Sequence, residues 1–473
     1  MGTINSAMSL MGGALDADQE ALSVVANNVA NANTTGYSEE KPNWQENAPI
    51  SIGGIQVGDG VTETGATSQR ARVLQERLDQ QQQVASASGT RLEALSNIQA
   101  LFNPDSGSAS ATAGDIGSDI TSFFDSFSSL EGDATDIALR EQVLSSASTL
   151  AGDISGTANS LNEQSAALNQ DAAGVTGQVN SLTSAIAQLN LQIESTSPES
   201  DAGPLEDQRQ QDLSQLSQLI GINQVTTENN GLSITTTSGQ LLVSEGQSFQ
   251  LTTGTVNGVT DFFLGRTDIT HGLATGGGQL GGYLTARDED IPNVLNSLDQ
   301  LAYNISTAVN AQNNAGVDLS GATGTAANAL NIFSQPAQVQ GSAAAMTVVM
   351  TDPTQIAAAS SGGGTGDNSN AVALAGLAGQ TIVNGQTPVN FYSTFVSTLG
   401  STVSSVQAEN TAQSASVTQL QSQKNALSSV NLNDEAAAMS TLETSYQAAS
   451  QVFTLLNTLM ASALNLGDQT TVA

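Results

Sequence analysis

The chain has 473 residues, with 10 Lys and Arg against 44 Asp and Glu and a formal net charge of −34 at pH 7. This charge makes nucleic acid and anionic membrane surfaces poor partners. There is no Cys, which excludes disulfides and thiol chemistry. Because aromatic residues make up only 4% of the chain, the core must consist mainly of Ala, Leu, Val and Ile. Because charged residues make up only 11%, the surface must be largely Ser, Thr, Asn, Gln and Gly. A thin, elongated protein suits this composition better than a thick globule.

The length is enough for about three domains. No apolar run approaches the ~18 residues of a membrane-spanning helix. The first basic residue is Lys41, so the charged region that begins an ordinary secretory signal peptide is absent.

The N-terminal stretch repeats apolar residues at steps of four and three, with one miss at Asp18. The series is Ile4, Met8, Met11, Leu15, Leu22, Val25, Val29 and Ala32. The C-terminal stretch repeats this pattern without a miss, at Met439, Leu442, Tyr446, Ala449, Phe453, Leu456, Met460 and Ala463. A seam with this period is typical of a helix that needs a partner helix. We therefore expect the two ends to meet each other or copies of themselves; the alternative is two amphipathic helices on one globular core.

The first seam ends in an Asn-rich motif. Its residues are Asn27, Asn28, Val29, Asn31, Asn33, Thr34, Thr35, Gly36 and Tyr37. The Asn side chains can bond neighbouring backbone and stop the helix, and Gly36 supplies a position where φ can be positive. The motif resembles the N-terminal signature that flagellar rod, hook and hook-associated proteins share: paired Asn, a branched apolar residue, further Asn, then Thr-x-Gly-Tyr/Phe.

The pattern after this motif predicts a β-hairpin over 50–61, broken at Gly53–Gly54. A helix is expected over about 68–102 and carries four of the ten basic residues. These are Arg70, Arg72, Arg77 and Arg91. They either pair with local Glu or meet acidic surface on a neighbouring subunit. A Gly- and Ser-rich loop is expected over 103–117.

The next pattern predicts helices over 116–130, 134–195 and 205–220, with a break in the long one near Gly174 and Gly177 and a turn at Pro198 and Pro204. At Gly221 the period changes from 3.6 to 2, which predicts short strands between 232 and 264 joined by Asn-Gly, Ser-Gly and Glu-Gly turns. Helix is expected again over 279–311 and 391–430, with a β-like segment at 344–351 and a Gly-rich loop at 361–366 before the stretch 371–377.

The fold class that we expect is mainly α with small β insertions, in an elongated multi-domain protein whose terminal helices form a coiled coil. The expected domains are a terminal coiled-coil domain of 1–62 with 431–473, a helical bundle domain of 63–221 with 280–343 and 352–430, a small β-domain of 222–279, and the β-like segment 344–351.

The middle of the chain carries further motifs of the same superfamily. These are Gly278-Gln-Leu-Gly-Gly-Tyr-Leu-Thr-Ala-Arg-Asp288, Leu298-Asp-Gln-Leu-Ala302, Val309-Asn310, Gly316-Val-Asp-Leu-Ser-Gly321 and, near the C-terminus, Val430-Asn-Leu-Asn-Asp-Glu435 with Tyr446-Gln-Ala and Val452. They resemble the family of the first hook-associated protein more than rod or hook proteins, whose middle is mostly β. An extra Asn433 departs from the usual Asn-Leu-Asp-Glu order.

The resemblance implies a structural subunit of the bacterial flagellum that joins hook to filament as a ring layer built by its own termini. It implies export through the flagellar type III channel without a signal peptide. The implied partners are copies of this chain, hook protein, the second junction protein and through it flagellin, and an export chaperone, with no nucleic acid and no membrane. The implied assembly residues are Ile4, Met8, Met11, Leu15, Leu22, Val25, Asn27, Asn28, Val29, Asn31, Asn33, Gly36, Tyr37, Met439, Leu442, Tyr446, Phe453, Leu456 and Met460.

No residue pattern in the sequence indicates a catalytic, cofactor-binding or metal-binding site. His271 is the single His and lies in a Thr-His-Gly-Leu loop. Gly276-Gly-Gly-Gln-Leu-Gly281 fits a dinucleotide pattern, but no βαβ unit surrounds it. Trp44, the only Trp, is expected to be a packing anchor. We therefore expect no enzyme; the alternatives are a hook or rod subunit, or a secreted adhesin or enzyme on a helical stalk.

Overall fold

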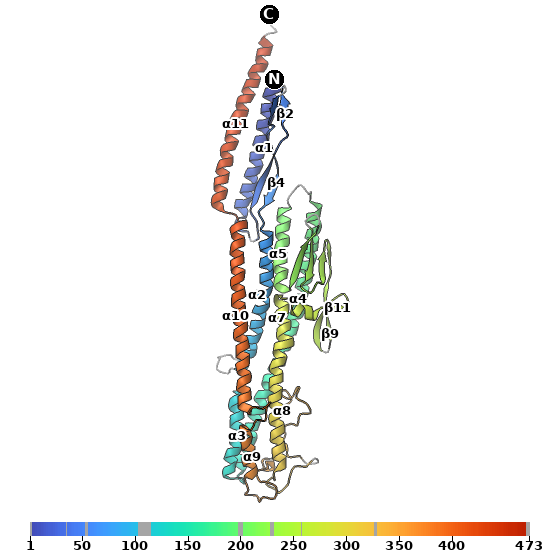
Figure 1. The fold of residues 1–473 in the computed structure, drawn as a ribbon, viewed down its shortest axis with the longest axis vertical. Helices are drawn as coiled ribbons and strands as arrows, with labels where there is room; N and C mark the ends of the chain where they lie inside the picture. The colour runs from blue at the N-terminus through green and yellow to red at the C-terminus, as the bar shows by residue number, and fades with distance from the viewer. Residues whose placement is uncertain are drawn as a thin grey trace.

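The computed structural model describes residues 2–34, 36–52, 55–102, 115–196, 202–227, 231–256, 258–325 and 329–469. The chain forms a long, narrow rod whose helices run along its axis, and both termini lie at the same end (Figure 1). None of the helices in these ranges is both long and apolar enough to cross a membrane.

The end of the rod that carries both termini is built from α1 (Gly2–Asn31), α11 (Leu432–Gln469) and a β-ribbon. The two helices run side by side in opposite directions (Figure 1). The ribbon pairs β1 (Glu40–Glu46) with β4 (Val61–Ser68) and encloses the short pair β2 (Ile50–Ile52) and β3 (Ile55–Val57). We call α1, this ribbon and α11 the terminal module.

The shaft of the rod is a set of long helices. The helices α2 (Arg72–Ala100) and α10 (Pro388–Ser428) pack along each other below the terminal module. Beside them lie α3 (Ile116–Gly132), α4 (Ile137–Ser195), α5 (Gly203–Leu219), α6 (Thr270–Ala274), α7 (Gly278–Thr285), α8 (Ile291–Ala315) and α9 (Ser369–Gly376). A π-helical turn, η3 (Ala286–Asp290), joins α7 to α8, and short 3₁₀ turns are η4 (Pro353–Gln355) and η5 (Leu377–Gly379).

Local capping explains where several of these helices begin. The Asp115 side chain accepts a hydrogen bond of 3.1 Å from the Gly117 amide at the start of α3. Asp136 does the same for the Ala138 amide at 2.7 Å at the start of α4. An N-cap Asp satisfies one of the orphan amides of the first turn and complements the helix dipole. The helix α10 begins with Pro388, whose missing amide costs nothing at this position.

The helix α4 is unbroken over 59 residues, so the predicted break near Gly174 and Gly177 is wrong. Ala172, Val175 and Val179 on the same stretch are buried against the β-domain. Their burial stabilises the helix by more than the ~1 kcal/mol that each Gly costs relative to Ala in a helix interior.

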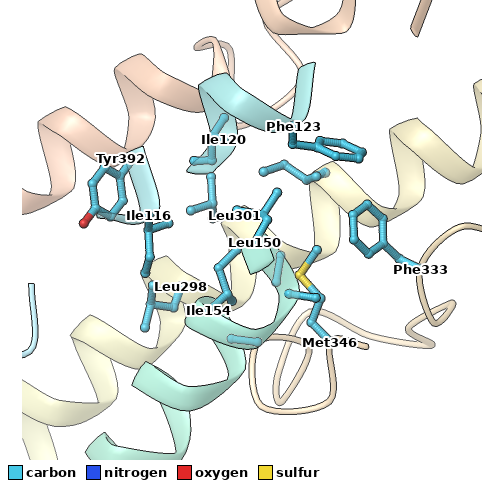
Figure 2. Close-up of a cluster of buried hydrophobic side chains, with 14 of the residues drawn as sticks. Ile116, Ile120, Phe123, Leu150, Ile154, Leu298, Leu301, Phe333, Met346 and Tyr392 are labelled. Atoms are coloured by element: carbon cyan, nitrogen blue, oxygen red, sulfur yellow. The ribbon is translucent and has the colours of Figure 1, made fainter. Parts of the chain in front are cut away.

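The main hydrophobic core includes residues of α3, α8 and α9, which lie at the end of the rod opposite the termini (Figure 1), and Figure 2 shows part of this core. Phe123 of α3 is fully buried and packs edge-on against Phe127 and Phe333, with ring centroids 5.3 Å apart in both pairs. Four Phe side chains, Phe123, Phe124, Phe127 and Phe333, therefore gather where α3, α4, α8 and the 330–358 segment meet. Arg140 is also buried here and donates to the Ala134 carbonyl at 3.0 and 2.6 Å and to the Pro353 carbonyl at 3.4 Å, so it joins α4 to the segment around η4.

The β-domain contains two antiparallel sheets. One has the order β5 (Ile222–Thr226), β6 (Leu232–Thr236), β7 (Leu241–Ser244), β8 (Gln247–Ser248), and the other β11 (Thr267–Asp268), β10 (Val259–Leu264), β9 (Leu251–Val256). Ile234, Val243 and Phe262 bury their side chains against α4 in a second core. The sequence predicted this small β insertion, but not β5 or β11.

Several other expectations change. Residues 344–351 form no strand; Val348 makes only an isolated bridge with Phe333, because neighbouring Ala and Met side chains pack into the core instead of pairing in a sheet. The 50–61 hairpin is present as β2–β3, but the larger β1–β4 pairing around it was not predicted. Trp44 is 47% exposed, so it is not a packing anchor within this chain. Some expected features lie outside or partly outside the described residues. These are the turns at Gly53–Gly54, Pro198 and Asn230–Gly231 and most of the 103–117 loop.

Candidate assembly interface

The face that α11 turns toward α1 is the predicted C-terminal seam. Along the described part of α11, the half-buried positions are mostly the seam residues, and α1 is the helix along which α11 packs. Met439, Leu442, Ala449, Phe453, Leu456, Met460 and Ala463 all belong to this set. Tyr446 is the exception, because it is 38% exposed. The seam therefore joins the two ends of one chain.

The N-terminal seam is only partly the contact face of α1. Ile4, Met8, Met11, Leu15 and Leu22 are half-buried and Val25 is buried, whereas Val29 is 41% exposed. The most deeply buried residues of α1 are the small Ala17 and Ala21, with Val25 and Asn28 continuing the same stripe. This stripe is displaced from the predicted seam because α1 must pack on two partners at once, α11 and the ribbon.

Asn28 ties the two ends of the chain together at the base of the terminal module. Its Nδ2 donates to the Glu40 carbonyl at 2.8 Å and to Glu435 Oε1 at 2.9 Å. Its Oδ1 accepts from the Glu40 amide at 3.0 Å and from the Tyr37 hydroxyl at 2.8 Å. Asn28 is 1% exposed and Glu435 5% exposed. Both donor hydrogens and both lone pairs of the Asn28 amide are therefore used, and we call this network the Asn28–Glu435 knot.

The other motif residues act on the helix end. Asn31 Nδ2 donates to the Asn27 carbonyl at 3.1 Å and to Asn27 Oδ1 at 2.9 Å, and Thr34 bonds Asn31 Oδ1 at 3.2 Å. Asn27 and Asn33 are exposed. The predicted bond from an Asn side chain to neighbouring backbone is present at Asn31, the last residue of α1. Sequence reasoning missed the long-range role of Asn28, and no signal within the N-terminal motif itself pointed to Glu435.

Gly36 has φ of +89°, so the predicted positive φ is confirmed. It lies in the turn between α1 and β1 rather than directly after the last helical residue Asn31, and the Tyr37 amide bonds the Thr34 carbonyl at 3.2 Å within this turn. A Cβ at Gly36 would meet no atom within 4 Å. The requirement for Gly is therefore one of backbone conformation.

Acidic groups inside the terminal module have perturbed pKa values. Burial raises the pKa of Glu435, and the hydrogen bond from Asn28 partly opposes this shift. Burial and a hydrogen bond shared with Glu20 of α1 raise the pKa of Glu63 on β4. Burial also raises the pKa of the Tyr37 phenol, with Glu40 and Asp207 adding to the effect. The module thus holds carboxyl groups that resist ionisation.

Polar contacts join the terminal module to the shaft. The Glu39 amide donates to the Ser428 carbonyl at 2.9 Å, and the Ser38 amide to Asp207 Oδ2 at 3.1 Å. Arg70 donates from Nε to Asp207 Oδ1 at 2.8 Å and also pairs with Glu206. A cavity of about 410 Å³ opens at this joint, between α2, α5, α10 and the turn after α1.

The arginines of α2 and its flank mostly pair within the chain. Arg72 Nη2 lies 3.4 Å from Glu206, which also pairs with Arg70. Arg91 forms two 2.8 Å bonds with Asp290 of η3. These contacts favour the local-pairing interpretation, but the acidic partners lie on α5 and η3 rather than on the same helix. Arg77 is exposed.

The residues of the Gly278–Asp288 motif pack α7 and η3 against neighbouring elements. A Cβ on Gly282 would lie 2.6 Å from the Ala87 carbonyl of α2, and one on Gly278, whose φ is +72°, would lie 2.5 Å from the Ile220 backbone. Arg287 donates 2.8 Å to the Thr260 carbonyl of β10 and 2.9 Å to Asn169 of α4. Gly278, Gly282 and Arg287 thus hold α7 and η3 against α2 and the β-domain, and no phosphate-binding loop is formed.

No chemical centre emerges among the residues that the structure describes. His271 is exposed on the short helix α6. Within the described ranges, no group of three or more His, Cys, Asp and Glu side chains is placed to hold a metal ion.

A rod of helices whose two chain ends build one module, with no chemical centre in the part described, defines an elongated structural subunit. Two family models match: the helical domain of the flagellar hook-associated protein FlgK over residues 95–327, and the flagella basal body rod protein over residues 8–37. The chain is 27% identical to flagellar hook-associated protein 1 of Salmonella typhimurium, over 98% of this chain and 99% of the relative. It is 26% identical to the protein of the same name from Bacillus subtilis, over 96% of each.

The alignment with the Salmonella relative spans 561 positions, more than the 473 residues of this chain, so the relative carries insertions. The solved structure of the flagellar hook junction protein FlgK from Burkholderia pseudomallei matches with a TM-score of 0.65 and 19% identity, over 75% of this chain and all of that one. The similarity to flagellar hook-associated protein 1 thus extends over nearly the whole chain, and the chain is a structural component of the bacterial flagellum.

Proposed function

We propose that this chain is the subunit that joins hook to filament, assembling as a ring layer through its N- and C-terminal helices. The observation that carries the proposal is the terminal module itself, in which the Asn28–Glu435 knot and the α1–α11 seam join the two ends of the chain. The names of the relatives, which refer to the hook and its junction, support this position in the flagellum.

The proposal assigns the assembly role to the seam and motif residues of α1 and α11. It also assigns the expected organisation: a terminal domain of 1–62 with 431–473, a helical bundle domain, and the β-domain of 222–279. The contacts between the terminal module and the shaft at Ser38, Arg70 and Asp207 are polar, and the hydrophobic core of the shaft does not extend into the module. Because each domain has its own core, this supports a domain boundary at the joint.

The partners that we propose are copies of this chain, the hook protein, the second junction protein and through it flagellin, and an export chaperone before assembly. The chain would reach its site through the flagellar type III channel. Its role is structural rather than catalytic and uses no cofactor.

Deleting the gene tests the proposal. Hooks should remain, filaments should be absent, and flagellin should be shed into the medium, with the full chain restoring filaments. Loss of hooks as well would indicate a hook or rod subunit instead. Normal filaments in the deletion strain would overturn the proposal altogether.

A further inference from the structure

A second apolar stripe of α11 lies beside the face that packs on α1. Val452 is 43%, Leu455 60% and Leu459 49% exposed, and their spacing of three and four residues places them on one helix face. At 100° per residue, this stripe lies roughly 100° around the helix from the seam residues Phe453, Leu456 and Met460. The helix α11 therefore has one apolar face occupied by α1 and a neighbouring one unoccupied. We call Val452, Leu455 and Leu459 the outer stripe.

The ribbon exposes apolar side chains on the other flank of the module. It contacts α1, and Figure 1 shows α11 and the ribbon on opposite sides of that helix. Trp44 is 47% and Val61 39% exposed. The register pairs Trp44 with Glu63 and Glu46 with Val61, so Trp44 and Val61 lie on the same face of the ribbon. Trp is the residue type most enriched at interface hot spots.

The charge pattern indicates which partner the outer stripe can approach. Residues 444–467 contain no charged residue, although the whole chain carries a net charge of −34. Residues 1–15 are also uncharged. The half of the helical pair remote from the shaft is thus neutral. A neutral stripe on one copy is not repelled by the acidic surface of another copy, so the outer stripe can approach the ribbon even though Glu46 and Glu63 lie on the same ribbon face as Trp44.

We propose that the outer stripe of one copy packs on the Trp44 face of the ribbon of the next copy. The inference rests on the proposed ring. Stripe-to-stripe pairing would form a two-fold dimer and stop, whereas a contact between two different surfaces repeats from copy to copy and can close a ring. The outer stripe and the Trp44 face are different surfaces, one on α11 and the other on the ribbon, as such a contact requires.

Single cysteines test this contact, because the native chain has none. Two full-length variants, Leu455→Cys and Trp44→Cys, are supplied together to cells that lack the native gene. Isolated hook–filament structures are then treated with a short bismaleimide. Thr454→Cys with Gln45→Cys is the matched control, since both residues are exposed and neighbour the test positions on other faces. We expect mixed dimers of the test pair to exceed those of the control pair by about tenfold, as for one specific interface contact.

Two outcomes would overturn the proposed contact without refuting the proposed ring. One is restored filaments without dimers between positions 44 and 455, and the other is equally strong dimers of Leu455→Cys with itself. Failure of the unsubstituted chain to restore filaments would instead refute the proposed function. A second variant guards against a folding defect: Leu455→Asp should lose filament attachment with unchanged helicity in solution, and Thr454→Asp should not. Normal attachment of Leu455→Asp would contradict the proposal.

Discussion

The core around Phe123 and the terminal module lie in the same chain but are stabilised differently. Around Phe123, residues from α3, α4, α8 and the 330–358 segment bury Phe, Leu and Ile side chains almost completely (Figure 2). In the terminal module the fully buried side chains are mainly Ala17, Ala21, Val25, Asn28 and Glu435, and most seam residues stay half-exposed. Because hydrophobic stabilisation scales with buried apolar area, the core can be stable alone, whereas the module gains little until a neighbour covers it.

The difference suggests that the core provides stability and the terminal module provides the assembly contacts. The core keeps its shape independently of partners. The terminal module has one specific polar knot that sets how the two ends meet, and a charge-free outer half in which further burial is still to come. Association then supplies the apolar contacts that the isolated chain lacks. The predictions that follow perturb one region and leave the other as the reference.

The largest expected effect is in the core. Phe123→Ala should lower the free energy of unfolding by about 3–5 kcal/mol, because it leaves a cavity where three Phe rings meet. Denaturant unfolding followed by circular dichroism measures this. Phe249→Ala, at a position 40% exposed, should change stability by no more than about 0.5 kcal/mol. Equal losses in the two variants would show that burial around Phe123 is not what stabilises the shaft.

A smaller and local effect is expected at the knot. Asn28→Ala removes all four bonds of the amide and leaves Glu435 buried without its donor, at a cost of about 1–3 kcal/mol to the pairing of α1 with α11. Hydrogen exchange should rise in both helices, while the unfolding of the core stays unchanged. Asn33→Ala, at an exposed position of the same motif, is the control. If both variants exchange like the native chain, the knot does not hold the ends together.

Gly36 tests the turn below the knot. Gly36→Val should cost more than ~1 kcal/mol locally, because a β-branched residue is strained at φ of +89°. Gly36→Asn should cost less, since Asn tolerates positive φ. We expect export of Gly36→Val to persist while filament attachment and swimming weaken. Wild-type swimming of that variant would indicate that the motif needs only its Asn residues.

The smallest expected effect is a pH dependence of the module. The folded pKa of Glu435 is raised above its unfolded value, so its contribution to stability is fully present below the unfolded pKa and is lost as pH rises through the folded pKa. The pKa of Glu63, which burial also raises, acts in the same direction. Exchange protection of α11 should therefore be higher at pH 5 than at pH 7, and Glu435→Gln should reduce the difference.

Salt provides an independent check on the same acidic groups. If like charges only oppose pairing of the ends, salt should strengthen the association of terminal peptides, because exposed charges are screened within ~10 Å at 0.1 M. If the acidic ends instead dock on arginines, salt should weaken it. Since Arg70 and Arg91 already pair with Asp207 and Asp290, we expect strengthening. Peptide helicity that falls with salt would contradict a pairing driven by the apolar seam.

Sequence periodicity predicted much of the fold because the terminal seams are long and regular. The α11 seam is the face toward α1, and the change of period at Gly221 marks the β-domain. The sequence could not show that α1 has two partners, which moves its buried stripe to Ala17 and Ala21, nor that packing on the β-domain carries α4 across Gly174 and Gly177.

The sequence motifs include Asn28 and Glu435 but could not show that these two residues bond each other. Asn28 and Glu435 lie in two motifs separated by 407 positions, and a hydrogen bond over that separation leaves no periodic signal. The exposure of Trp44 was also not predicted. A single Trp near Pro42 suggests a buried residue as long as its strand pairing with Glu63 is unknown.

Hydrogen exchange of the purified full-length chain, read by mass spectrometry, tests the central claim most directly. We predict that α1 and α11 exchange through local opening long before α3 and the first half of α4, and that brief proteolysis trims roughly the first 40 and last 40 residues to leave a resistant shaft. Once the chain is assembled, exchange in α1 and α11 should slow while that of the core stays unchanged. Equal protection of the ends and the core in the free chain would contradict it.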